Sequence, residues 1–190
     1  SCALPMADTF DVAVSGTGGI AGMMSAGGVI EGCYNTGTII ADSPGVGGLV
    51  GQDDGMTMAN CYTTGTVTST YTGDWDTAAG AVVGYVKGQK NNIKHNFYLA
   101  QSLNAIGKLN PSCTGAVDAP VSKTAEELKS QEFLTELKEY FTQELTYTVW
   151  AADSENTNSG YPVITGAAEK KDYHKQLTAF KVGKLNMTID

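Results

Sequence analysis

Residues 47–51 read GGLVG, and this short apolar run between glycines decides the fold. It occurs earlier as GGIAG at 18–22 and later, in a more divergent form, as GAVVG at 80–84. Internal repeats with a period of about 20–50 residues are typical of proteins built from stacked units. The recurrence therefore indicates that the first half of the chain repeats one structural unit.

A second block follows each copy of the first. Residues 60–67 read NCYTTGTV, residues 32–39 read GCYNTGTI, and a third copy keeps only NFYL at 96–99. The two blocks alternate with a period of about 30 residues. Because the third copy is shortened, we interpret it as the last unit, where the stack ends.

Stacking explains why such a unit recurs. Each unit has too few apolar residues to close a core alone, whereas stacked units bury a continuous one. Parallel strands about 4.8 Å apart place equivalent residues above one another, so we expect columns of like side chains along one axis. The expected columns are Ile20, Leu49 and Val82; Cys33, Cys61 and Phe97; and Tyr34, Tyr62 and Tyr98.

The glycines of the repeat are expected at corners, where the backbone turns sharply and needs a positive φ. Asn35 and Asn60 suit the same duty, because Asn tolerates the left-handed region. Cys33 and Cys61 on adjacent units are close enough for a disulfide or can remain buried thiols. We favour thiols, because Phe97 at the equivalent position fits a packing role.

The two blocks together resemble the GLUG-motif repeats of bacterial surface proteins. The resemblance covers residues 18–99 and is carried by GGLVG followed by NCYTTGTV. Such repeats occur in cell-wall-anchored proteins, including streptococcal immunoglobulin A proteases, and are generally taken to form β-helical stalks. The resemblance implies an extracellular or cell-surface location and a role in adhesion or display.

Composition narrows the function classes. The chain has 190 residues, 23 of them Gly, and a net charge of −8. An acidic chain is repelled by phosphate backbones and by anionic lipid, so we expect no nucleic-acid partner. No apolar run approaches the length of a membrane span, so we expect no membrane insertion. The density of glycine among Val, Ile and Thr favours short strands joined by tight turns.

Both ends of the sequence are interpreted as cut from a longer polypeptide. The first residues, SCALP, lack the basic and apolar regions of a signal peptide, and Cys2 does not resemble a lipidation site. Cys2 is instead interpreted as the end of an earlier, truncated copy. The four cysteines include no Cys-x-x-Cys, which disfavours a zinc or thioredoxin-like site.

The composition changes after about residue 118. Thr124 and Glu127 form a capping-box pattern, which predicts a helix over 125–140. We expect this helix to cover the open end of the stack. Trp150 and the segment NSGYPVI at 158–164 resemble the closing segment that often follows GLUG repeats, and Trp150 and Tyr161 are expected to pack.

The predicted organisation has three parts. Residues 1–118 form a right-handed parallel β-solenoid, with the handedness taken from the general preference of parallel crossovers. Residues 119–165 form a helix-containing cap. Residues 166–190 form a linker and, from their alternating pattern, the start of a further β module. The fold class is therefore mainly β.

No catalytic constellation emerges from the sequence. His95 and His174 have no nucleophile beside them and are expected to be solvated. The carboxylate pair Asp53 and Asp54 precedes Gly55 as in a turn. The oxygen-rich run DSENTN at 153–158 lacks the glycine and distal glutamate of a calcium loop. We expect no enzyme activity, no cofactor and no metal.

The loop at 70–76, TYTGDWD, is the strongest binding candidate. Tyr71 and Trp75 could stack on a sugar ring while Asp74 and Asp76 bond its hydroxyl groups. The competing interpretation is a loop anchored on the flank of the stack by Trp75.

The sequence thus predicts a rigid scaffold that presents a binding surface to host or bacterial surface glycans or proteins. The alternative is a carbohydrate-binding or polysaccharide-processing β-helix module.

Overall fold

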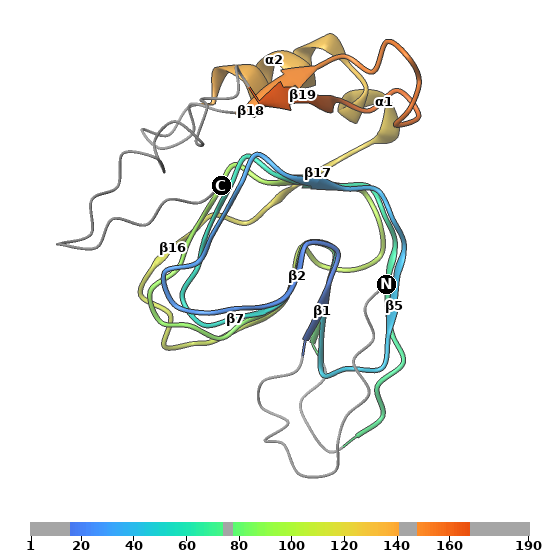
Figure 1. Ribbon diagram of the computed structural model, residues 1–190. Helices are drawn as coiled ribbons and strands as arrows, with labels where there is room; N and C mark the ends of the chain where they lie inside the picture. Colours follow the sequence, from blue (N-terminus) through green and yellow to red (C-terminus); the bar gives the residue numbers. More distant parts are fainter. Residues whose placement is uncertain (1–15, 74–77, 141–147, 168–190) are drawn as a thin grey trace, which may run out of the picture.

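The computed structural model describes residues 16–73, 78–140 and 148–167. Short strands arranged in parallel, stacked sheets make up most of this part of the chain, with two helices and one antiparallel strand pair beside them (Figure 1). The prediction of a mainly β fold with parallel strands is confirmed. We call each pass of the chain through successive sheets a rung.

Four rungs follow one another along the sequence. Rung 1 contains β1 (Gly16–Gly18), β2 (Ala21–Met24), β3 (Val29–Glu31), β4 (Tyr34–Asn35) and β5 (Ile39–Ala41). Rung 2 contains β6 (Gly45–Gly47), β7 (Val50–Asp53), β8 (Thr57–Ala59), β9 (Tyr62–Thr63) and β10 (Val67–Ser69). Rung 3 contains β11 (Ala78–Gly80), β12 (Val83–Val86), β13 (Asn92–Lys94) and β14 (Phe97–Leu99), and rung 4 contains β15 (Ile106–Leu109), β16 (Ala116–Val117) and β17 (Val121–Lys123).

Equivalent strands of successive rungs pair in parallel. The sheets have the orders β1-β6-β11, β15-β12-β7-β2, β16-β13-β8-β3, β17-β14-β9-β4 and β10-β5. Figure 1 looks along the direction of stacking, and the rungs superimpose in outline. The third copy of the repeat is therefore not the last unit, because β15, β16 and β17 add a fourth rung that carries neither sequence block.

The first predicted column is present. The Ile20 N–H donates to the Leu49 carbonyl, and the Leu49 N–H donates to the Val82 carbonyl, each at 2.9 Å. Leu49 and Val82 are fully buried, whereas Ile20 is 43% exposed. The main core lies between the sheets of β2, β7, β12 and of β3, β8, β13, and its large members include Leu49, Met58, Val82 and Ile93.

The columns of the second block differ from prediction by one residue in rung 3. Tyr34 pairs with Tyr62 as expected, but Tyr62 pairs with Phe97 rather than with Tyr98. Cys61 therefore lies opposite Asn96, whose side-chain oxygen accepts the Cys61 N–H at 3.1 Å. The prediction that Phe97 is equivalent to Cys61 is wrong. It assumed an apolar residue at this position of rung 3, whereas the Cys61 N–H of rung 2 needs a hydrogen-bond acceptor there, which Asn96 provides.

The glycines of the first block serve close packing rather than corners. The sheet of β1, β6 and β11 lies directly against that of β2, β7 and β12, and a Cβ on Gly51 would lie 2.3 Å from the Thr17 nitrogen. The glycines with positive φ among the described residues lie elsewhere: Gly27, Gly32, Gly55 and Gly160. The predicted corner role is thus wrong for the first block but holds for Gly32 and for Asn60, at φ 54°.

Asn35 is also not a corner residue. It ends β4, and its side-chain NH₂ donates to the carbonyls of Gly48 at 2.9 Å and Gly37 at 3.0 Å. Its side-chain oxygen accepts the Gly37 N–H at 3.0 Å. Asn35 therefore holds the start of the next turn through side-chain bonds, without a left-handed backbone.

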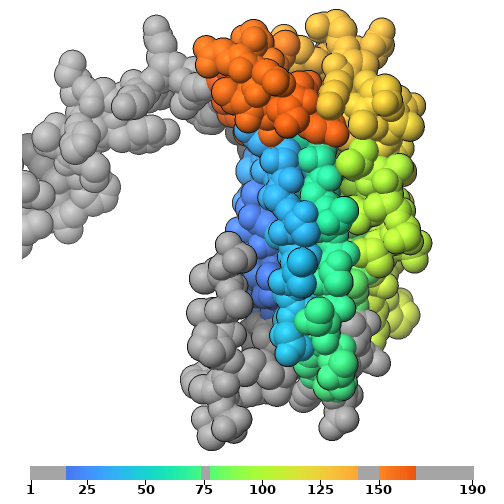
Figure 2. Space-filling view, turned by 90° about the vertical axis from the view of Figure 1, so that its right-hand side faces the viewer, coloured from blue at the N-terminus to red at the C-terminus, as the bar shows by residue number. Residues whose placement is uncertain are grey.

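Two helices replace the single predicted one. The capping box of Thr124 and Glu127 is present and begins α1 (Ala125–Leu128), and Ser130 caps a second helix, α2 (Gln131–Glu139). The strands β18 (Thr148–Ala151) and β19 (Val163–Ala167) pair antiparallel beside the helices. Figures 1 and 2 show that this segment lies along the side of the stack and spans several rungs. The prediction that the helix covers an open end is therefore wrong.

Candidate functional site

The predicted binding loop is described only in part. Tyr71 is half-buried, its N–H donates to the Ser69 hydroxyl at 3.4 Å, and its phenol folds back over Gly73. Asp74, Trp75 and Asp76 lie outside the described residues. Tyr71 thus lies just after β10, and the next two residues, Thr72 and Gly73, are exposed.

The structure separates the carboxylates of Asp53 and Asp54. Asp53 is buried, and its Oδ1 accepts the N–H groups of Gly55 at 2.8 Å and Met56 at 3.4 Å. Asp54 is exposed. Burial raises the pKa of Asp53, against the hydrogen bonds from Gly55 and Met56 and with a smaller contribution from Asp54. Asp53 therefore closes its own turn, as the sequence suggested, and does not form a paired catalytic site with Asp54.

The loop at 153–158 is organised around one carboxylate. Asp153 accepts the N–H groups of Thr157 at 2.8 Å, Asn158 at 2.7 Å and Gly160 at 2.9 Å, together with the Thr157 hydroxyl at 3.0 Å. The pKa of Asp153 is lowered although desolvation acts to raise it, because the hydrogen bonds from Gly160, Asn158 and Thr157 outweigh that effect. A carboxylate surrounded by N–H donors is an anion satisfied by the protein, which favours the interpretation as a structural turn over a calcium site.

An aromatic cluster joins the helices to the flank of the stack. We call it the flank cluster; its buried members are Tyr62, Phe97, Leu128, Phe133, Leu134, Leu137 and Trp150. Tyr34 stacks on Tyr62 with ring centroids 5.3 Å apart, and Phe133 meets Tyr62 and Phe97 edge-on at 5.8 and 5.0 Å. One helix thereby contacts side chains of successive rungs. Trp150 is a packing residue, as predicted, and Tyr161 packs at the edge of this cluster.

Hydrogen bonds also connect the stack to the segment packed on its flank. The Tyr62 hydroxyl donates to the Pro162 carbonyl and accepts from the Asn158 side chain at 2.9 Å. The Asn60 side-chain NH₂ donates to the Leu137 carbonyl at 3.0 Å. These contacts leave the flank closed, so the aromatic cluster serves architecture and does not offer a stacking platform to a ligand.

His95 belongs to this interface and is not solvated as predicted. Its ring stacks on Tyr140 at 4.1 Å, meets Phe97 edge-on at 4.8 Å and bonds the Asn60 side-chain oxygen at 3.2 Å. Desolvation lowers the pKa of His95, with Glu136 acting in the opposite direction and Lys123 in the same one. No local pattern indicates this packing, because Tyr140 is 45 residues away along the chain.

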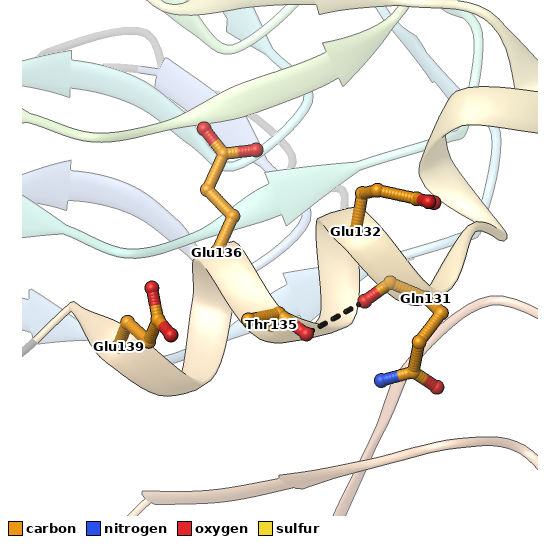
Figure 3. A pocket seen from close by; sticks show the side chains of 5 residues that line it. All are labelled: Gln131, Glu132, Thr135, Glu136 and Glu139. Carbon is orange, nitrogen blue, oxygen red and sulfur yellow. Dashed lines mark hydrogen bonds between the residues drawn. The ribbon is translucent and has the colours of Figure 1, made fainter.

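The outward face of α2 borders a shallow hollow. Figure 3 shows Gln131, Glu132, Thr135, Glu136 and Glu139 along it, and these residues line a space of about 440 Å³. Glu136 is held by Lys123, whose Nζ lies 3.0 Å from a carboxylate oxygen. Thr135 donates its hydroxyl to the Gln131 carbonyl at 2.9 Å.

This hollow suits hydrogen bonding rather than catalysis. Its carboxylates, amide and hydroxyl can accept bonds from hydroxyl or cationic groups, and its charge disfavours anions. The sequence contained a usable signal, because glutamates at 132, 136 and 139 follow the spacing of one helix face. The spacing alone does not distinguish a binding surface from an ordinary solvated helix face.

Clusters of metal-ligating side chains and long apolar helices are both absent from the described ranges. No group of three or more His, Cys, Asp or Glu side chains among them is arranged to hold a metal ion. Neither α1 nor α2 has the length and apolar character of a membrane-crossing helix. Comparison with protein-family models, curated proteins and solved structures found no match for this chain.

Proposed function

We propose that the chain is a rigid β-solenoid scaffold within a secreted or cell-surface bacterial protein of the GLUG-repeat type. Its role is structural and adhesive: it holds a binding surface away from its attachment point. The observation that carries this proposal is the register of the four rungs, in which equivalent residues pair from one rung to the next. We take the solenoid to be right-handed, following the preference of parallel crossovers.

Stiffness supports a display role. Backbone hydrogen bonds between rungs run along the stacking axis, so extension of the stack requires many of them to break together. The flank cluster adds a second connection, because Tyr34, Tyr62 and Phe97 of three rungs contact one layer of aromatic and helical side chains. Because both the backbone hydrogen bonds and the flank cluster join successive rungs, we expect the stack to resist bending.

The proposed organisation keeps three parts. Residues 1–118 form the solenoid, residues 119–165 brace its side, and residues 166–190 link to a further β module. The last strand of the stack, β17, lies just after this first boundary and pairs with β14. Of the third part, residues 168–190 lie outside the described residues.

The binding surface of this proposal has two candidate parts. One is the loop with Tyr71, Asp74, Trp75 and Asp76, and the other is the acidic hollow on α2. Both carry hydrogen-bond acceptors, so the proposed partners are glycans or proteins of host or bacterial surfaces. The proposal includes no enzyme activity, no cofactor, no nucleic-acid partner and no membrane insertion.

A surface-exposure experiment tests the scaffold proposal. Intact cells of the producing bacterium are treated with a protease, and the released peptides are identified by mass spectrometry. We expect peptides of this chain to be released from intact cells, with a cytosolic enzyme as the control for lysis. Release of these peptides only after lysis would contradict the proposal.

A carbohydrate-binding or polysaccharide-processing module is the second candidate function. It is favoured by the aromatic and acidic loop and by the carboxylate-lined hollow of about 440 Å³. A glycan array probed with the wild-type chain, with Trp75→Ala and with the control Tyr98→Ala separates the two candidates. Binding lost by Trp75→Ala but kept by the control supports this candidate, whereas no binding to any glycan removes it.

A further inference from the structure

Two cysteines lie on adjacent rungs and face the same core. Tyr34 and Tyr62 pair in parallel, and Cys33 and Cys61 immediately precede them. The Cys33 N–H points to the Cys61 sulfur at 3.5 Å, and the Tyr62 N–H donates to the Cys33 carbonyl at 3.1 Å. Cys61 belongs to the main core, and Cys33 packs against the same core. Both are free thiols in the structure.

This arrangement matches the geometry of a disulfide. Parallel strands place paired Cα atoms about 4.8 Å apart, and disulfides join Cα atoms about 4.4–6.8 Å apart. The equivalent residue of rung 3 is Asn96, so among the described rungs this column holds only the sulfurs of Cys33 and Cys61. We propose that Cys33 and Cys61 are a redox-active dithiol that closes to a disulfide between rungs 1 and 2 on contact with a small-molecule disulfide.

The two thiols are unequal, which sets the order of the reaction. Cys33 is half-buried and lies in the first described rung, whereas Cys61 is fully buried. A hydrogen bond from the Cys61 side chain lowers the pKa of Cys33 to about 7, against the effect of desolvation. Burial raises the pKa of Cys61. Cys33 is therefore the attacking sulfur, because a thiol with a pKa near the ambient pH exchanges fastest.

The exchange balances with one oxidant. The Cys33 thiolate attacks one sulfur of oxidised glutathione, forms a mixed disulfide and releases one glutathione thiolate. The Cys61 sulfur then attacks the Cys33 sulfur and passes its proton to the second glutathione sulfur, which leaves as a thiol. Two protein thiols are oxidised, and one glutathione disulfide is reduced to two glutathione thiols.

The bond would fasten a rung whose apolar side chains are partly exposed. Rung 1 holds the exposed apolar residues Ile20, Val29 and Ile40. Closing a loop between residues 28 positions apart restricts the unfolded chain and holds rung 1 on rung 2. This inference concerns the fold's own chemistry and does not depend on the proposed adhesive role.

Disulfide mapping on the folded wild-type chain tests the inference. The protein is incubated with oxidised glutathione, blocked with an alkylating reagent and digested without reduction. We expect a peptide pair linked through Cys33 and Cys61 that dithiothreitol separates. We also expect slower amide hydrogen exchange in β3 and β4 after oxidation. Cys113, a half-buried thiol outside the pair, is the internal control and should not enter the linkage.

Two variants keep the test decisive. Cys61→Ser should stop the reaction at a stable glutathione adduct on Cys33, and Cys33→Ser should leave Cys61 unmodified in the folded protein. Circular dichroism checks that each variant is folded. The inference is overturned if the folded wild-type chain keeps both thiols, or if it carries a stable glutathione on Cys33 while Cys61 stays free.

Discussion

At the scale of single residues, one corner of the stack accepts three different amino acids. Gly32, Asn60 and His95 occupy equivalent positions just after β3, β8 and β13, with φ of 57°, 54° and 51°. Glycine adopts this conformation without cost, and Asn and His are enriched there among other residues. His95 thus occupies its corner through a backbone requirement and also contributes its ring to the interface with the helices.

The ring of His95 predicts a pH dependence. Desolvation lowers its pKa in the folded chain, so protonation favours the unfolded state. Its contribution to stability is complete above the ordinary value of about 6.5 and is lost as the pH falls through the lower folded value. We expect the wild type to lose stability relative to His95→Asn over this range, measured as Tm against pH by circular dichroism.

The His95→Asn substitution removes the titrating ring while keeping the backbone conformation. Asn keeps the positive φ that Asn60 already adopts one rung away, so the backbone is not strained. Glu136 and Lys123 also face His95, and both are present in the wild type and the variant. Parallel Tm curves for the two proteins between neutral pH and pH 5 would show that the His95 ring does not titrate as proposed.

At the scale of elements, the first sequence block explains how two sheets meet without side chains between them. Gly51 and Gly84 occupy equivalent places in β7 and β12. A Cβ on Gly84 would lie 2.6 Å from the Val46 nitrogen of the facing sheet. The glycines therefore set the distance between sheets, and the apolar residues beside them, such as Leu49 and Val82, fill the core on the other side.

A single methyl group between these sheets should be costly. In Gly51→Ala the new Cβ would meet backbone atoms of Thr17, Gly22 and Gly16 at 2.3–2.7 Å, and backbone cannot move aside as a flexible side chain can. We expect a loss of about 3 kcal/mol or more in the free energy of unfolding. Guanidinium denaturation followed by circular dichroism measures it.

Gly37→Ala is the matched control. Its Cβ would have one neighbour, the Asn35 Oδ1 at 3.4 Å, which is an ordinary contact. The expected change is below about 0.5 kcal/mol. Equal losses for Gly51→Ala and Gly37→Ala would mean that glycine is required for chain flexibility rather than for the approach of the sheets.

At the scale of the whole molecule, the stack is uneven in burial. Leu49 and Val82 in the middle rungs are fully buried, and Ile20 in the first is 43% exposed. Leu109 and Val121 in rung 4 are exposed as well. The loss in the free energy of unfolding on truncating a side chain of one column should therefore depend on the rung in which that side chain lies. Each unit of a stack contacts only its neighbours, so the number of packed neighbours differs between rungs.

Truncation along the first column measures this dependence. We expect Leu49→Ala to cost about 2–5 kcal/mol, because it opens a cavity with packed neighbours on both sides. Ile20→Ala should cost about 1 kcal/mol, because much of that side chain already contacts solvent. Urea denaturation gives both values. A loss for Ile20→Ala as large as that for Leu49→Ala would show that rung 1 is packed as tightly as rung 2.

The sequence alone was sufficient for the parallel, mainly β character of the stack, the column of Ile20, Leu49 and Val82, and the capping box at Thr124. These features are local or periodic. The alignment of repeated blocks in the sequence predicts which residues pair between rungs, and a cap involves residues three positions apart. The corner at Asn60 was recognised for the same reason, since its φ depends on its own backbone.

Four features are visible only in the tertiary structure: the fourth rung, the one-residue offset at Phe97, the packing role of the glycines and the position of the helices on the side of the stack. Each of these depends on atoms that are distant along the chain. A glycine that turns a corner and a glycine that faces another sheet are identical in sequence, and the cluster of Tyr62, Phe133 and Trp150 joins segments that no periodic pattern relates.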